Sequence, residues 1–131
     1  MANPGARPTI WVLGIAAIGE ATTGLVMLAH PPILVKLLLG VESSGVTNMM
    51  SRIAGMALVG LGVASWPYRA FPRGSPQSFL GMLIYSLLVT LYLLVLGVER
   101  RSVGLLLWPL ALLHAALTIL LGRAWLRVRT D

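Results

Sequence analysis

Three ionisable side chains lie inside long apolar stretches of the sequence. They are Glu20, Arg52 and His114. A charge at the centre of a bilayer costs at least ~2.5–3.5 kcal/mol, so each side chain should face protein or water and have a polar partner. A carboxylate can pair with a guanidinium or exchange a proton with an imidazole. These residue types therefore indicate either binding of a polar ligand or proton transfer.

Their spacing predicts that the three side chains lie at similar depths. If each stretch is a helix, Glu20 lies about 13–14 Å and His114 about 16–17 Å from the outer end of its helix. Arg52 lies about 7–8 Å from its own outer end, and its long side chain can reach toward Glu20. Three further polar residues lie near these levels and complete the candidate set: Thr23, Tyr85 and Tyr92.

Two interpretations of this polar layer are open. In the first, a pair between Glu20 and Arg52 only fixes the helix register, and His114 donates to a backbone carbonyl. In the second, the side chains line a pocket within the membrane. Pro109 favours a cavity wall, because a proline inside the last apolar stretch removes a backbone donor and leaves the carbonyl of Leu105 free.

Other classes of site have little support in the sequence. The chain has no cysteine, which excludes disulfides and thiolate metal sites. Its two histidines, His30 and His114, lie at different depths and lack a ligand spacing, so no metal site is predicted. The motifs of nucleophile elbows, phosphate loops and dinucleotide sites are missing. We therefore assign no catalytic residue and no cofactor from the sequence.

The apolar stretches themselves predict transmembrane helices. Of the 131 residues, 57% are hydrophobic and only 11% are charged, against roughly a quarter charged in soluble proteins. About 20 helical residues are needed to cross the hydrocarbon core. Four stretches are long enough: residues 9–29, 47–66, 78–98 and 103–125. The prediction is an all-α, antiparallel bundle of four transmembrane helices in one membrane domain, residues 1–131.

A short additional helix is predicted after the first span. Pro31 and Pro32 end that span. Residues 33–40 are apolar apart from Lys36 and are too short to cross the membrane. They should therefore lie along the membrane interface as a short amphipathic helix.

The second stretch is rich in small residues, which allow helices to approach closely in lipid. Gly55 and Gly62 lie two turns apart on a shared face, and Gly60 and Ala64 form a small-xxx-small pair. We interpret these four residues as a packing seam within the monomer. The alternative is that they form the interface of a homodimer.

The distribution of Lys and Arg predicts the orientation in the membrane. With an even number of spans, both termini and the second connection lie on one side. That side carries six basic residues and the other side three: Arg7, Arg69, Arg73, Arg123, Arg127 and Arg129 against Lys36, Arg100 and Arg101. The positive-inside rule then predicts a multi-pass protein of the inner (plasma) membrane with both termini cytoplasmic. It also accounts for the net charge of +6, so nucleic acid is not an expected partner.

Several short motifs are spread over most of the chain. They are Glu20 with the following Thr22-Thr23-Gly24, Pro31-Pro32 before LLLG at 37–40, SRIAG at 51–55, LIYS at 83–86 and LLWPLALLHA at 106–115. Together they resemble the small four-span bacterial membrane proteins that are loosely grouped as DoxX-like. The resemblance implies an accessory role in quinone-linked oxidation and carries over no catalytic residue. The chain also resembles small multidrug resistance transporters in length and in its first-helix Glu, but it departs from them at Arg52 and His114.

We therefore predict a small integral membrane protein that acts as a binding or accessory component with a polar intramembrane pocket. Its expected partners are the lipid bilayer, a larger membrane complex or a second copy of the chain, and a quinone or other apolar small molecule. One alternative is a small proton-coupled transporter, which would need a homo-oligomer because four spans rarely form an alternating-access pathway alone. A further alternative is a membrane enzyme acting on a lipid or quinone, with Glu20 and His114 as acid and base.

Overall fold

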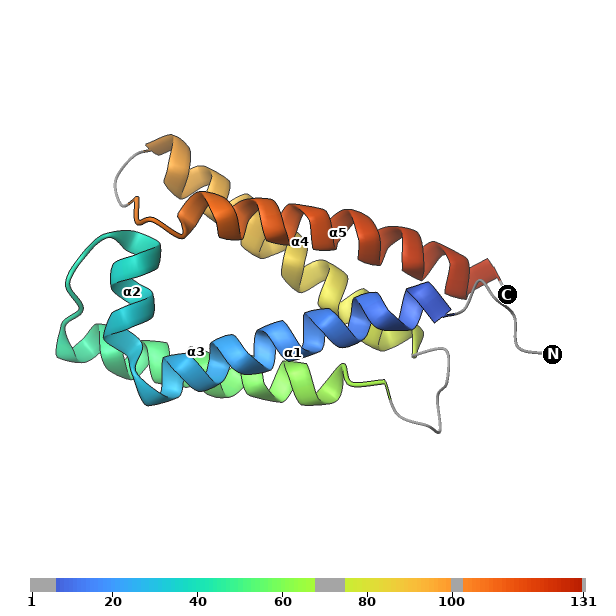
Figure 1. The fold of residues 1–131 in the computed structure, drawn as a ribbon, viewed down its shortest axis with the longest axis horizontal. Coiled ribbons are helices and arrows are strands. Elements are labelled where there is room, and N and C mark those ends of the chain that lie inside the picture. The colour runs from blue at the N-terminus through green and yellow to red at the C-terminus, as the bar shows by residue number, and fades with distance from the viewer. Residues whose placement is uncertain (1–6, 68–74, 100–102, 131) are drawn as a thin grey trace.

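Five helices make up the parts of the chain that the computed structural model describes, residues 7–67, 75–99 and 103–130 (Figure 1). They are α1 (Arg7–Ala29), α2 (Pro31–Leu39), α3 (Gly45–Ala64), α4 (Pro76–Glu99) and α5 (Leu107–Thr130). Four of them, all but α2, are long and apolar enough to cross a membrane. The predicted all-α bundle of four spanning helices, with a short helix after the first, is therefore confirmed.

The four long helices are arranged as two pairs. α1 packs along α3, and α4 packs along α5, whereas the contacts between the pairs come mainly from α1 against α5 and α4. The pairs converge at the end where α1 begins and α5 ends, and they diverge toward α2, which lies between them at the opposite end (Figure 1). The molecule is thus held together differently at its two ends.

Glycine allows the close approach within the α1–α3 pair. A Cβ atom added at Gly55 would lie 2.7 Å from the carbonyl oxygen of Gly24, and one added at Gly62 would lie 2.6 Å from that of Ala17. Gly60 has nothing within 4 Å of such an atom, and both Gly60 and Ala64 are exposed. Two of the four small residues of the predicted seam therefore pack within the monomer, and the other two lie on its outer surface.

An apolar core joins the two pairs at the end where they converge. Leu13 of α1, Phe79 and Met82 of α4, and Leu121 of α5 are fully buried in this cluster. Burial of apolar groups does not by itself drive association in lipid, so close packing of these side chains provides the contact between the pairs.

Backbone hydrogen bonds join the pairs at the other end. The carbonyl oxygens near the end of α2 lack partners within their own helix. The oxygen of Leu37 accepts from the amide of Leu106 at 2.8 Å, and that of Leu38 accepts from the amide of Gly104 at 3.0 Å. We call these two bonds the α2 clamp. A side chain at Gly104 would overlap the carbonyl of Leu37, so only glycine fits at this position.

The α2 clamp changes where the last helix begins. α5 starts at Leu107 rather than at residue 103, because the preceding residues extend along the end of α2. Pro109 consequently lies in the first turn of α5, where the amide that it lacks would have no partner within the helix. The prediction that Pro109 interrupts the interior of the helix is therefore wrong.

The outer faces of the long helices are apolar, as contact with lipid requires. Large hydrophobic side chains on every long helix are exposed, among them Trp11, Met56, Val98 and Leu112. Charge is found at the polar turn after α2, where Lys36 Nζ lies 2.7 Å from Glu42 Oε1. The hydrogen bond and charge of Glu42 raise the pKa of Lys36.

Candidate functional site

Three polar side chains from three helices meet between the two helix pairs. Glu20 of α1 and His114 of α5 are each about 5% exposed, and Glu20 Oε1 lies 4.0 Å from His114 Nε2. The ring of Tyr85 from α4 contacts the imidazole edge to face, with centroids 5.8 Å apart and planes at 75°. The Tyr85 hydroxyl approaches the Glu20 carboxyl. We call this group the Glu20–Tyr85–His114 cluster.

Helical periodicity places Glu20 and His114 in the interior. Residues three and four apart share one face of a helix. The buried stripe of α1 contains Leu13, Ala16, Ala17, Glu20 and Gly24, and that of α5 contains Leu107, Ala111, His114, Leu117, Leu121 and Ala124. Glu20 and His114 therefore each occupy one position of a buried stripe whose other residues are apolar or glycine. The cluster lies between the apolar core at one end of the molecule and the α2 clamp at the other.

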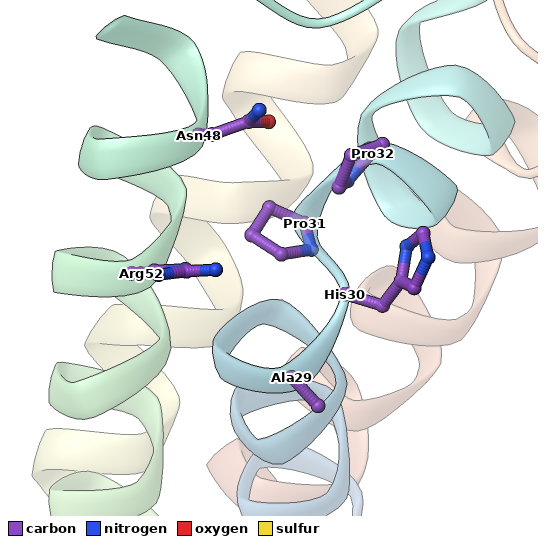
Figure 2. A pocket seen from close by; sticks show the side chains of 6 residues that line it. All are labelled: Ala29, His30, Pro31, Pro32, Asn48 and Arg52. Carbon is purple, nitrogen blue, oxygen red and sulfur yellow. The ribbon is translucent and has the colours of Figure 1, made fainter. Parts of the chain in front are cut away.

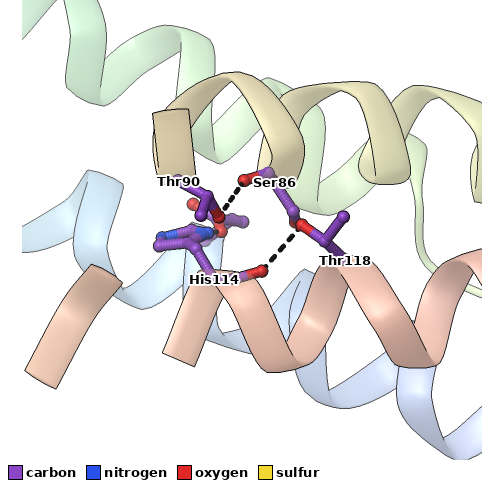
Figure 3. Close-up of polar contacts among 5 residues, drawn as sticks. Ser86, Thr90, His114 and Thr118 are labelled. Atoms are coloured by element: carbon purple, nitrogen blue, oxygen red, sulfur yellow. Dashed lines mark hydrogen bonds and ion pairs between the residues drawn. The ribbon is translucent and has the colours of Figure 1, made fainter. Parts of the chain in front are cut away.

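Two buried polar atoms at this level have no hydrogen-bond partner in the part of the chain that the structure describes. They are Nδ1 of His114 and Oγ of Ser86 on α4. The neighbouring threonines do not serve them, because Thr118 Oγ1 donates to the carbonyl of His114 at 2.8 Å and Thr90 Oγ1 donates to that of Ser86, also at 2.8 Å (Figure 3). Leaving such a group unpaired costs roughly 1–3 kcal/mol, so both atoms favour an additional partner.

The role of Ser86 is not evident from its type, since serines in transmembrane helices commonly bond to their own backbone. Its position is informative, however. Ser86 lies in the buried stripe of α4, one turn from Thr90 and one turn from Met82, with a fully buried side chain. The 3.6-residue periodicity of α4 could therefore have added it to the candidate set.

The other three residues predicted from the sequence are not part of the cluster. Thr23 is half-buried on α1, one turn beyond Glu20. Tyr92 is 65% exposed on α4. Arg52 is exposed on α3 and forms no ion pair with Glu20. Ser51 and Gly55 form the α3 face that packs on α1. Arg52 is rotated from that face by about 100° and lies instead at the turn between α1 and α2.

A metal centre does not account for the cluster. Within residues 7–67, 75–99 and 103–130, no three His, Cys, Asp or Glu side chains are grouped so that they could hold a metal ion. The chemistry available to Glu20, Tyr85, Ser86 and His114 is hydrogen bonding and proton transfer.

Comparison with known proteins gave no match to a family model, a curated protein or a solved structure. Function is therefore inferred from the geometry of the site.

Proposed function

We propose that this protein is a small integral inner-membrane protein that binds an apolar molecule with a polar head group between its two helix pairs. The proposal rests on one observation: Nδ1 of His114 and Oγ of Ser86 are buried without a partner among the described residues, and Nε2 of the same histidine lies 4.0 Å from the carboxyl of Glu20. A ligand that supplies the missing hydrogen bonds would offset the cost of burying these groups.

A quinone has the chemistry that this arrangement would recognise. Its carbonyl oxygens accept hydrogen bonds, which the hydroxyl of Ser86 and a protonated imidazole nitrogen of His114 can donate. Its reduced form carries hydroxyl groups that can donate to the carboxylate of Glu20. The resemblance to DoxX-like proteins points to the same class of ligand, and we infer a binding or accessory role, in which the protein presents the molecule to a larger membrane complex.

Substitution of Glu20 tests this proposal. Purified wild-type protein in detergent is titrated with a short-chain benzoquinone by calorimetry, and its co-purified apolar molecules are identified by mass spectrometry. Glu20→Gln keeps the shape of the side chain and removes its charge, and we expect at least about tenfold weaker quinone binding, as for the loss of one charge-assisted hydrogen bond.

Glu42→Gln is the matched control, because it removes a carboxylate from an exposed turn far along the chain from the cluster. It should bind the quinone like the wild type. If Glu20→Gln binds the quinone and retains its co-purified molecules as the wild type does, the site does not have this function.

A second candidate function is proton-coupled transport by a homo-oligomer. One observation favours it: Gly60 and Ala64 lie on the exposed face of α3, where a second copy could approach closely. In that case Glu20 and His114, 4.0 Å apart, would exchange the proton. A monomeric mass in lipid nanodiscs would contradict this alternative and leave the binding role unaffected.

A further inference from the structure

A polar pocket lies away from the Glu20–Tyr85–His114 cluster, where α1 ends, α2 begins and α3 passes beside them. Its volume is about 220 Å³. The residues that line it are Ala29, His30, Pro31, Pro32, Asn48 and Arg52. Figure 2 shows Asn48 and Arg52, one turn apart on α3, extending toward the turn at Pro31.

The polar groups of this pocket lack partners. The side chain of Arg52 makes no ion pair or hydrogen bond to any residue within the described ranges. The side-chain amide of Asn48 makes no hydrogen bond to a described residue either, so its nitrogen has a donor available. Because Arg52 is exposed on a spanning helix, its guanidinium must find a counter-charge outside this set of residues or remain hydrated.

The charge of the pocket favours an anion. None of its lining residues is acidic, and Glu42, the carboxylate nearest in sequence, is paired with Lys36. The C-terminus of α1, with its partial negative charge, meets the N-terminus of α2, with its partial positive charge. These partial charges oppose one another, so the guanidinium of Arg52 is the main charge of the pocket.

The depth of Arg52 fits the phosphate layer of a bilayer. Arg52 lies seven residues after the start of α3, which corresponds to about 10 Å along the helix. From there a long side chain can extend its charged end to the boundary between hydrocarbon and head groups. The apolar ring of Pro31 and the side chain of Ala29 border the same pocket.

We propose that this pocket binds the phosphate group of a membrane phospholipid in the leaflet on the α2 side. The guanidinium of Arg52 would hold two phosphate oxygens in its planar fork, and the amide nitrogen of Asn48 would donate to a third. The glycerol region would contact Pro31 and Ala29. This site shares no residue with the Glu20–Tyr85–His114 cluster, so it stands independently of the proposed function.

Native mass spectrometry of the full chain in a non-ionic detergent tests the proposal. The probe is dioleoylphosphatidylglycerol, compared with dioleoylglycerol, which lacks the phosphate. We expect the wild type to retain the phospholipid and not the diacylglycerol. Arg52→Gln should bind the phospholipid about tenfold more weakly, as for the loss of one bidentate charged contact. Asn48→Ala should bind it severalfold more weakly.

Lys36→Gln is the matched control, because it removes one positive charge near the same end of the molecule and leaves the pocket intact. It should bind the phospholipid like the wild type. Thermal unfolding of each variant establishes that it is folded. If Arg52→Gln does not fold, Arg52→Lys replaces it, and the loss of the planar fork should still weaken binding severalfold.

Three results would overturn the proposal. The first is unchanged phospholipid binding in the Arg52 variants. The second is an equal loss of phospholipid binding in Lys36→Gln, which would indicate an effect of general surface charge. The third is displacement of the lipid by millimolar inorganic phosphate, which would assign the pocket to free phosphate. A Glu20→Gln protein should retain its phospholipid, which separates this test from that of the proposed function.

Discussion

At the scale of single residues, the cluster combines groups that are costly to bury together. One ring nitrogen of His114 lies 4.0 Å from a buried carboxyl oxygen, and the other has no partner among the described residues. By contrast, Thr90 and Thr118 satisfy their hydroxyls on the carbonyl four residues earlier. An apolar residue at position 86 or 114 would avoid an unpaired polar atom. Residues that break such a local rule without a structural gain are typical of functional sites.

This contrast predicts opposite responses to two alanine substitutions on α4. Ser86→Ala removes a buried hydroxyl without a partner, so its stability should equal that of the wild type or exceed it by up to about 1 kcal/mol. Thr90→Ala removes a satisfied hydroxyl one turn away and should lose about 0.5–1 kcal/mol. Thermal unfolding in detergent measures both changes. In the quinone titration Ser86→Ala should bind the quinone more weakly than the wild type, and Thr90→Ala should bind it equally well. A clear loss of stability in Ser86→Ala would instead show that the Ser86 hydroxyl is structural.

At the scale of elements, the α1–α3 pair depends on glycines that differ in their surroundings. Gly55 lies against the backbone of α1, and Gly60 lies on the outer face of the same helix. Gly55→Ala would bring a methyl group to 2.7 Å from a carbonyl oxygen. Because both partners are helix backbone, the helices must separate, and we expect a loss of about 1–3 kcal/mol.

Gly60→Ala is the control for this substitution, since it adds the same methyl group to the same helix where nothing lies within 4 Å. Its stability should be unchanged or slightly higher, because alanine is the better helix former. Unfolding followed by circular dichroism compares the two. Equal stabilities would mean that α1 and α3 do not pack through this face.

The sequence predicts the elements better than it predicts their rotation. Long apolar runs identify the four spans, since few other structures accommodate them. Depth along a helix can also be counted, and Glu20 and His114 meet in the structure. Rotation about the helix axis is set by partners that the sequence does not specify. The sequence therefore allows Arg52 to pair with Glu20, whereas the structure places Arg52 in the pocket at the turn between α1 and α2. The α2 clamp is a contact between backbones and leaves little trace in side-chain types.

At the scale of the whole molecule, two different connections hold the helix pairs together. Side-chain packing joins them at the end where α1 begins, and the α2 clamp joins them at the other end. The cluster lies between the two connections along α1 and α5. The ligand proposed above would bind between the two pairs, and an apolar molecule dissolved in the membrane fits that position.

The orientation of the bundle determines which leaflet supplies the phospholipid and on which side a partner would meet the termini. The start of α1 and the end of α5 lie at the same end of the bundle, opposite α2 (Figure 1). The excess of Lys and Arg predicts that this end is cytoplasmic.

The natural chain has no cysteine, so single cysteines can report each end without background. Ser44→Cys marks the exposed turn after α2, and Gln77→Cys marks the exposed first turn of α4 at the opposite end. In bacterial cells whose outer membrane has been permeabilised, a thiol reagent that cannot cross the inner membrane should label Ser44→Cys at once. It should label Gln77→Cys only after the inner membrane is opened. The reverse pattern would place the termini outside and move the proposed phospholipid site to the cytoplasmic leaflet.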